Sequence, residues 1–436
     1  MKIQSKLCAI QIFVLCAGLC PAGVRADYSV HEWGTFTSVQ GGDGVLQPWR
    51  PVQTSELPAF VHDWSRSKSD LNLVVGGPAI VNKGMMVTLQ RMETPVIYFY
   101  ANSGMKVDVN VDFPKGIITE WYPQASEIGP CISFKTNAPA VTTISKSGAG
   151  WKNLKLIAPV KNLSVLDDRL AQDNSGSHYF AARETASALV QSEFTSGTSK
   201  VVETEKFIFY RGAGSFATPL RVSVDAANDI AVENTGGENL AHLFLIRVHD
   251  GGRGKTGSVA AMNDLAAKES ARWPKTETLP LKEFQKQVGA RMKAVLVAEG
   301  LFPKEAGAMV NTWNDSWFAE EGDRVLYILP RTWTDETLPL TFNPKPTNLV
   351  RVMVGRAEIL TPKTEKVLSD ALVKAAEGGA DERKAAAREL KSLGRFAEPA
   401  LRLAKLENVS TNAFMLSHQL LSEIAAPPQS AAAKFQ

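Results

Sequence analysis

Cysteine is scarce in this chain: it has four among 436 residues, and three of them fall within residues 1–26. Those residues have the organisation of a cleavable secretory signal, in which two lysines precede the apolar run of residues 7–19 and Val24-Arg25-Ala26 supplies the cleavage site. We therefore predict an exported protein whose mature chain begins at or close to Asp27. A lipoprotein signal is the alternative, but Cys16 and Cys20 each follow a leucine that is too bulky for a lipidation site.

Removal of the signal leaves Cys131 as the one cysteine, so no intramolecular disulfide can form and the fold must depend on its hydrophobic core. It also removes three of the 48 basic residues and none of the 45 acidic ones, so the mature chain carries 45 of each sign. A neutral chain without blocks of lysine or arginine gives no electrostatic reason to expect a nucleic acid partner. Because no later segment approaches about 20 consecutive apolar residues, we also expect no transmembrane anchor.

Several catalytic motifs are absent as well. The chain has no Gly-x-Ser-x-Gly, no phosphate-binding Gly-Lys loop and no Rossmann glycine pattern, so elbow-type serine hydrolysis, nucleotide hydrolysis and NAD binding lack support. Its six mature histidines form no His-x-His or His-Glu-x-x-His pair. The acidic loops around Asp168 and Asp173 do not have the spacing of an EF-hand. The sequence therefore assigns no cofactor, and it assigns no oligomeric state.

Strand signals dominate the first half of the mature chain. Short segments rich in Val, Ile, Thr, Phe and Tyr alternate there with Gly, Pro, Asn and Ser, which is typical of antiparallel sheets. Residues 106–113 alternate strictly, which predicts a half-buried strand with its valines and Phe113 inside. Because no long helical pattern separates the strands, we predict a mainly β fold, an antiparallel β-sandwich over residues 27–255.

The remainder divides into a mixed region and a helical end. Residues 256–360 carry two helical patterns followed by strand signals, so they form either a separate domain or a helical insertion in one larger β-structure. The Gly-, Lys- and Ser-rich stretch 250–278 is interpreted as a linker or a long excursion. Residues 361–426 are predicted to be helical, and residues 427–436 to form a disordered tail.

The helical end contains a repeat-like unit. Residues 383–404 resemble one unit of a HEAT-like helical repeat, with Ala and Leu facing inward and an Arg-Phe-Ala-Glu-Pro turn between helices. A single unit cannot bury its own apolar face. We therefore expect this segment to pack against the rest of the chain or against a partner.

The densest group of chemically versatile residues follows the signal directly, at residues 31–37 (His-Glu-Trp-Gly-Thr-Phe-Thr). This segment resembles the opening of an uncharacterised family of exported bacterial proteins. Further similar segments are residues 93–100, 120–123, 182–185 and 206–212. The resemblance covers most of residues 28–360 and implies export and a shared fold, but it carries no catalytic residue across.

Carboxylate chemistry is the enzymatic option that the residues favour. Glycoside cleavage needs two carboxyl groups, usually with aromatic platforms for the sugar rings. The candidate catalytic residues are Glu32, Glu93, Glu120, Arg183, Glu184 and Arg211. The candidate binding residues are Trp33, Trp121, Tyr122 and Tyr210. Each has a structural alternative, because glutamate beside tryptophan is common where a strand covers a core, and Arg183-Glu184 with Tyr210-Arg211 can form a buried ion-pair network.

His31 is the metal candidate. If residues 28–39 form a regular strand, His31 and Glu32 point to opposite faces and cannot bind one ion. A bulge at Gly34 would re-aim them, and bulges are common beside active sites. A structural hydrogen-bonding role is the alternative for this histidine, as for the other five.

Two functional hypotheses from different classes follow. The first is an exported binding or structural protein that presents Trp and Tyr to a polysaccharide or an envelope protein. The second is an exported glycan hydrolase or lyase that uses Glu, Arg and Tyr groups. The enzyme hypothesis requires Glu32, Glu93, Glu120 or Glu184 to converge with Arg and Tyr in one open cleft.

Overall fold

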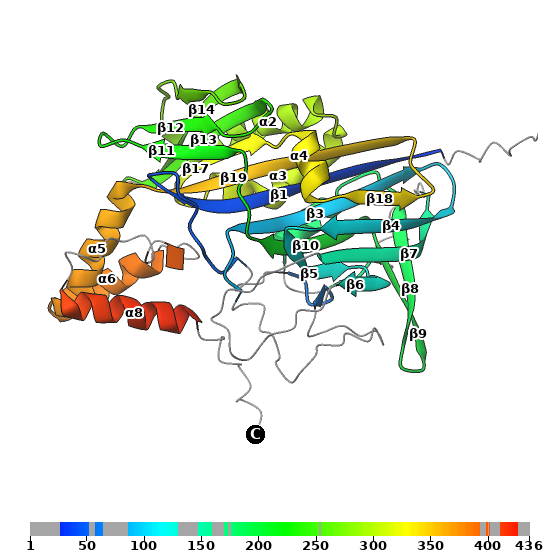
Figure 1. The fold of residues 1–436 in the computed structure, drawn as a ribbon, viewed down its shortest axis with the longest axis horizontal. Coiled ribbons are helices and arrows are strands. Elements are labelled where there is room, and N and C mark those ends of the chain that lie inside the picture. Colours follow the sequence, from blue (N-terminus) through cyan, green and yellow to red (C-terminus); the bar gives the residue numbers. More distant parts are fainter. Residues whose placement is uncertain are drawn as a thin grey trace, which may run out of the picture.

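The computed structural model describes residues 27–51, 57–63, 86–129, 147–158, 170–172, 176–252, 254–392, 398–399, 401 and 410–425. The predicted signal segment, Cys131, the acidic loops at Asp168 and Asp173 and the predicted tail lie outside these residues. Figure 1 shows long, twisted strands across most of the molecule and a group of helices at one end. The prediction of a mainly β fold with a helical C-terminal segment is confirmed.

The largest sheet has ten strands and contains segments from both sides of residue 255. Its order is β16-β14-β13-β17-β19-β1-β3-β10-β5-β2. The strand β1 lies at its centre, paired in parallel with β19 and antiparallel with β3. The bounds are β1 Tyr28–Gly41, β2 His62–Asp63, β3 Gln90–Ala101, β5 Gly116–Tyr122, β10 Ile208–Gly214, β13 Leu240–Asp250, β14 Lys255–Leu265, β16 Leu279–Pro280, β17 Gly322–Ile328 and β19 Asn348–Leu360.

Two smaller sheets cover one face of the large sheet. Val30 and Phe99 of the large sheet share a core cluster with Val109 and Trp151, and Leu243 and Leu245 share it with strands of the third sheet. The six-stranded sheet consists of β4 Met105–Phe113, β6 Glu127–Gly129, β7 Ser147–Ile157, β8 Leu189–Ser196, β9 Ser199–Glu205 and β18 Leu340–Asn343. The three-stranded sheet consists of β11 Leu220–Val224, β12 Ile230–Asn234 and β15 Ser270–Arg272. In β4, Val107, Val109, Val111 and Phe113 are buried, as the alternation predicts.

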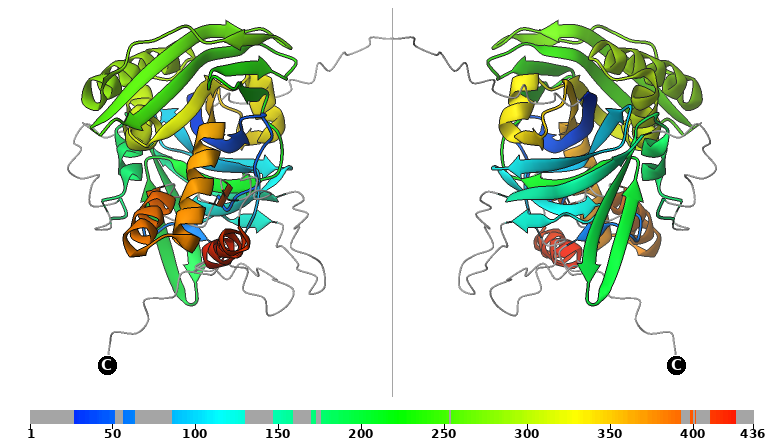
Figure 2. Two further views of the ribbon diagram at one scale, coloured as in Figure 1. Left: turned by 90° about the vertical axis from the view of Figure 1, so that its left-hand side faces the viewer. Right: turned by 90° about the vertical axis from the view of Figure 1, so that its right-hand side faces the viewer.

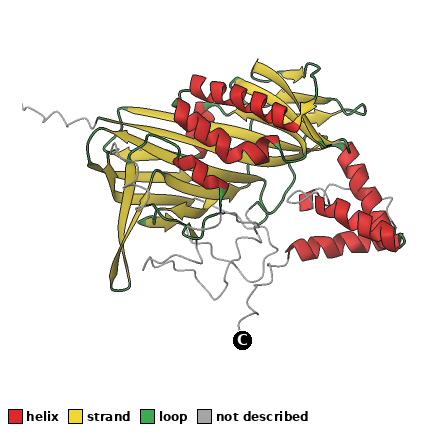
Figure 3. Cartoon of the chain, turned by 180° about the vertical axis from the view of Figure 1, so that it is seen from behind, coloured by secondary structure: helices red, strands yellow, loops and turns green. Residues whose placement is uncertain are grey.

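Helices cover the opposite face (Figure 3). They are η2 (His178–Arg183), α2 (Leu281–Ala298) and α3 (Pro303–Phe318). Met292 of α2 and Trp317 of α3 pack in one cluster with Trp33 and Val352 of the sheet. Gly300 ends the α2 segment with a φ of 105°, a conformation that favours glycine, and Pro303 occupies the first turn of α3. A further short helix, α4 (Arg331–Thr337), connects β17 to β18.

The C-terminal helices pack against one end of the sheets. They are α5 (Pro362–Glu377), α6 (Ala380–Ser392) and α8 (Thr411–Ala425). The left view of Figure 2 faces this end of the molecule. Leu368, Leu372 and Ala413 share a core cluster with Val39 and Trp49, so part of the apolar surface of these helices packs against the β structure. Residues 393–397, 400 and 402–404 of the repeat-like unit lie outside the described residues. Among the described residues, no helix combines the length and the apolar character needed to cross a membrane.

The linker interpretation of residues 250–278 is wrong. This stretch forms β14, which pairs with β13 along its whole length, and β15 of the three-stranded sheet. The Gly and Lys residues that suggested a linker stand at the ends of β14, whereas Ala260 and Leu265 within it are buried in the core. The uncharged run from Val259 to Met262 therefore forms a strand because β13 offers it a partner and the two faces are covered.

A bulge crosses the centre of the sheet at the Trp-Gly-Thr segment. The pairing of β1 with β3 shifts register between Trp33 and Thr35, and Thr94 on β3 adopts a φ of 44° there. A Cβ atom on Gly34 would lie 2.9 Å from Cα of Pro95. The glycine is therefore required for the close approach of β3, and the extra residue belongs to β3 rather than to β1.

We expect Gly34→Ala to destabilise the protein by about 1–3 kcal/mol, because a methyl group at this position overlaps the backbone of Pro95. Urea unfolding followed by tryptophan fluorescence measures this loss. Gly237→Ala is the matched control, since a Cβ atom there meets nothing within 4 Å. Equal unfolding midpoints for the two variants would show that the bulge does not need the glycine.

Candidate functional site

Glu32 lies in a sealed polar cluster inside the sandwich. Its carboxylate accepts hydrogen bonds from Nε of Arg351 at 2.6 Å and from the hydroxyl of Tyr210 at 2.5 Å. Arg351 also donates to Asp335 at 2.7 Å. Burial raises the pKa of the Tyr210 phenol, and the nearby Glu32 carboxylate raises it further, so the hydroxyl keeps its proton. Glu32 is 0% exposed, and it acts here as an acceptor that joins three strands.

Glu93 lies on the opposite face of the same sheet. It forms an ion pair with Arg91 and accepts a hydrogen bond from Thr37 at 2.7 Å. Because Glu32 and Thr37 are an odd number of residues apart on β1, their side chains point to opposite faces. Arg356 lies beside Thr37 in the strand register and continues this charged group. Its ion-pair partners are Glu320 at 2.7 Å and Glu358 at 2.5 Å, and Glu358 also pairs with Arg324 at 2.8 Å.

Glu120 and Arg211 are cross-strand neighbours on β5 and β10. Both side chains are 1% exposed, and the Thr119 hydroxyl donates to Glu120. Glu184, in contrast, is exposed and accepts a hydrogen bond from Asn311 at 3.1 Å. The four glutamates that the sequence suggested as catalytic residues are therefore not brought together in one open cleft, because three are buried and the fourth lies on the surface.

His31 anchors helix α3. Its Nδ1 atom lies 2.8 Å from Oε2 of Glu305, whose carboxylate also accepts from the Tyr100 hydroxyl at 2.6 Å and from the backbone N–H of Phe302 at 2.8 Å. Glu305 stands in the first turn of α3, so its carboxylate caps the helix and fixes it to the sheet. In the part of the chain that the structure describes, no group of three His, Cys, Asp or Glu side chains is placed to hold a metal ion.

Three of the four aromatic binding candidates are core residues. Trp33 and Trp121 are each 0% exposed, in the two hydrophobic clusters on opposite faces of the large sheet. Tyr210 is also buried and donates to Glu32. Their rings are enclosed in the core and are not exposed to a partner in this structure. Tyr122 is different, because its ring lines a pocket.

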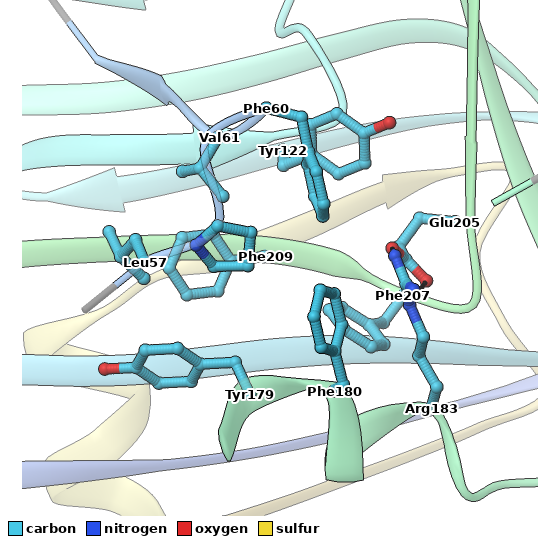
Figure 4. A pocket seen from close by; sticks show the side chains of 11 residues that line it. Leu57, Phe60, Val61, Tyr122, Tyr179, Phe180, Arg183, Glu205, Phe207 and Phe209 are labelled. Carbon is cyan, nitrogen blue, oxygen red and sulfur yellow. Dashed lines mark hydrogen bonds and ion pairs between the residues drawn. The ribbon is translucent and has the colours of Figure 1, made fainter. Parts of the chain in front are cut away.

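The pocket lies between the helix η2, the start of β10 and the loop before β2 (Figure 4). The half-buried rings of Phe60 and Phe180 stand at its mouth. Buried aromatic side chains form most of its inner wall, and the Arg183–Glu205 pair closes one end. Its lining residues are Leu57, Pro58, Phe60, Val61, Tyr122, Tyr179, Phe180, Arg183, Glu205, Phe207 and Phe209.

Short-range sequence features position η2 at this place. Ser177 precedes the helix and its side chain accepts from the backbone N–H of Tyr179 at 3.4 Å. The Tyr98 hydroxyl of β3 donates to the backbone carbonyl of Ala182 at 2.7 Å, which fixes the helix to the sheet. Phe180 and Arg183 are three residues apart and therefore project from one side of this helical turn. Arg183 lies over the Phe180 ring at 4.7 Å from its centroid.

Arg183 is held in one orientation by Glu205. Its Nε and Nη2 atoms both donate to the Glu205 carboxylate, the shortest contact being 2.6 Å, and Nη2 also donates to the Ala171 carbonyl at 2.8 Å. Burial raises the pKa of the Glu205 carboxyl group, and the charge of Arg183 opposes this effect. The guanidinium group thus forms a rigid polar edge on an otherwise aromatic pocket.

The size of the pocket limits what can enter it. Its volume is about 30 Å³. A buried water molecule needs a space of about 10–15 Å³, so a pocket of this volume could hold about two water molecules. It therefore suits the branched end of an aliphatic side chain rather than a complete sugar ring or a cofactor.

The sequence pointed to two of the pocket residues, Tyr122 and Arg183, and missed the others. Phe207 and Phe209 are two residues apart at the start of a strand, so their side chains lie on the same face. This spacing could have predicted one aromatic face there. Phe60 and Phe180 gave no such signal, because they stand in non-strand segments far from β10 in the sequence.

Comparisons with known proteins identify no family for this chain. No family model matches this sequence, and no curated protein sequence matches it. Among solved structures, the chain is similar to the yeast delta-COP-I mu-homology domain, with 7% identity, coverage of 77% of this chain and 98% of that chain, and a TM-score of 0.25. The same domain complexed with the Dsl1 WxWxV peptide has 8% identity, coverage of 77% and 96%, and a TM-score of 0.22. Similarity at this level does not bear on function.

Proposed function

We propose that this chain is an exported binding protein whose aromatic pocket, lined in part by Phe60 and Phe180, receives an apolar side chain of a polypeptide partner. The observation that carries the proposal is the small, aromatic-walled pocket with its half-buried mouth. Export rests on the charged, apolar and small-residue segments of residues 1–26. An envelope protein is then the class of partner that the protein would meet.

The walls of the pocket favour a polypeptide over a polysaccharide. Sugar rings need several hydrogen-bonding groups as well as an aromatic platform, and this pocket offers mainly carbon surface with polar groups at one end. The hydrolase alternative has less support, because three of its four candidate carboxylates are at most 1% exposed. Aromatic walls around a small apolar space are instead typical of anchoring pockets at protein interfaces.

The test is a saturation-transfer NMR titration of the mature protein with N-acetylleucine methylamide and, separately, N-acetylserine methylamide. We expect the leucine compound to bind in the millimolar range, at least about fivefold more tightly than the serine compound, because its isobutyl group leaves water. Equal affinities for the two compounds would contradict the proposal.

Phe180→Ala should weaken binding of the leucine compound by about fivefold or more, because it removes one wall of the pocket mouth. Phe414→Ala is the matched control: Phe414 is also a partly exposed phenylalanine, 42% accessible, but it lies on α8 in the C-terminal helices. If both variants bind like the unaltered protein, the pocket is not the binding site.

A further inference from the structure

One donor of Arg183 stays available at the pocket mouth. Its Nε and Nη2 atoms are engaged by Glu205 and Ala171, but among the described residues no acceptor bonds to Nη1. The Arg183 side chain is 13% exposed, and Nη1 is not one of the buried polar atoms that lack a partner, so this donor reaches the surface of the described structure. Because Glu205 holds the guanidinium plane, Nη1 has a fixed position beside the Phe60 and Phe180 rings, which lie 5.7 Å and 4.7 Å from Cζ of Arg183.

Among the described residues, the charged groups that act on Glu205 and Tyr122 are two of each sign. Lys206 acts electrostatically on Glu205, as Arg183 does, and Glu203 acts together with Glu205 on the Tyr122 ring that lines the pocket. In their ordinary ionised forms these are two positive and two negative groups. Glu203 is also held by the backbone N–H of Gln124 at 2.7 Å and by His62 at 2.8 Å. The local electrostatic field therefore gives a negatively charged ligand little more binding free energy than it gives a neutral ligand.

We infer that the ligand presents a neutral acceptor oxygen to Nη1 of Arg183 while its apolar group enters the pocket, which is the chemistry of an internal peptide residue with its backbone carbonyl. This inference rests on the proposed function, because it assumes that the pocket takes an apolar group. It adds that the recognised element is an uncharged carbonyl and not a terminal carboxylate. The partner would thus be bound within its chain rather than at its C-terminus.

Two probes of equal shape test this. 4-Methylpentanamide and 4-methylpentanoate share the isobutyl group and differ in carrying a neutral amide or a negative carboxylate. In titrations of the mature protein at pH 7, we expect the amide to bind at least as tightly as the carboxylate. Tighter binding of the carboxylate by about threefold or more would overturn the inference and leave the proposed function standing. Absence of binding by both probes would overturn the proposed function, and the inference with it.

A variant tests the role of the donor itself. Arg183→Lys keeps a positive charge beside Glu205 but removes the Nη1 donor, so amide affinity should fall by about fivefold, the effect of one hydrogen bond. Arg272→Lys, at an exposed arginine of β15, is the matched control. An Arg183→Lys protein that is folded and binds the amide with unchanged affinity would overturn the inference. If this variant does not fold, the comparison of the two probes on the unaltered protein decides the question.

Discussion

The Glu32→Ala variant is expected to lose about 3–5 kcal/mol of its free energy of unfolding. Removal of this carboxylate leaves Arg351, which is 6% exposed, without its partner on β1, and leaves the buried Tyr210 hydroxyl without its acceptor. Asp335 remains as a partner for Arg351, but its side chain is 45% exposed and cannot replace a buried ion pair. Urea unfolding of the variant and the unaltered protein measures the difference.

Two further proteins make this result interpretable. Glu193→Ala breaks an exposed pair with Lys200 and should leave the unfolding midpoint unchanged. The double variant Glu32→Met with Arg351→Met should recover part of the stability, because it removes both buried charges instead of isolating one. If the single variant Glu32→Ala is as stable as the unaltered protein, Glu32 is not the structural anchor described above, and a functional role for it returns.

Glu305→Ala is expected to destabilise the protein by about 3 kcal/mol or more. The carboxylate accepts from His31, Tyr100 and the backbone of Phe302, and a buried donor that loses its acceptor costs about 1–3 kcal/mol. Because these bonds fix the first turn of α3 to β1 and β3, hydrogen exchange should accelerate first in α3. Thermal unfolding and hydrogen exchange together measure the two effects.

Glu283→Ala is the matched control for Glu305→Ala. Glu283 also lies in the first turn of a helix, α2, but it is exposed and bonds only to Gln287 on its own helix. We expect its loss to change stability by about 0.5 kcal/mol or less. A similar loss of stability in both variants would show that Glu305 contributes no more than an exposed charge at a helix end. His31 would then not anchor α3 through Glu305.

Local patterns predicted local structure well in this chain. The alternation of residues 106–113 predicted which side chains of β4 are buried, and the two helical patterns within residues 256–360 predicted α2 and α3. These patterns work because strands and helices repeat over two and 3.6 residues whatever lies around them. The stretch 250–278 failed, because β14 owes its conformation to pairing with β13 rather than to its own composition.

The site depended on pairings that no local pattern contains. Arg351 is 319 positions from Glu32 and meets it because β19 pairs in parallel with β1. The sequence could place Glu32 and His31 on opposite faces of one strand, but it could not show that each face is covered. The charged and polar side chains of the motif segments are therefore mostly buried and held by ion pairs or hydrogen bonds. The sequence had left this structural role open as an alternative to catalysis or binding.

The pocket illustrates the same limit. The sequence indicated Tyr122 and Arg183 as candidate site residues. The other pocket residues Phe60, Phe180 and Glu205 come from a loop, a short helix and another strand. Their convergence depends on the packing of η2 against β3 and on the Arg183–Glu205 pair. The sequence thus indicated two residues of the pocket but not how they are arranged. The arrangement of the aromatic walls is what makes the pocket suit an apolar group.

The most direct test of the account is a crystal structure of the mature protein soaked with N-acetylleucine methylamide. The account predicts the isobutyl group in the pocket, against the edges of the mutually packed Phe60 and Phe180 rings, with a carbonyl oxygen of the compound within hydrogen-bond distance of Nη1 of Arg183. Density for the compound at another surface, for example between α5 and α8, with the pocket empty at saturating concentration, would contradict it.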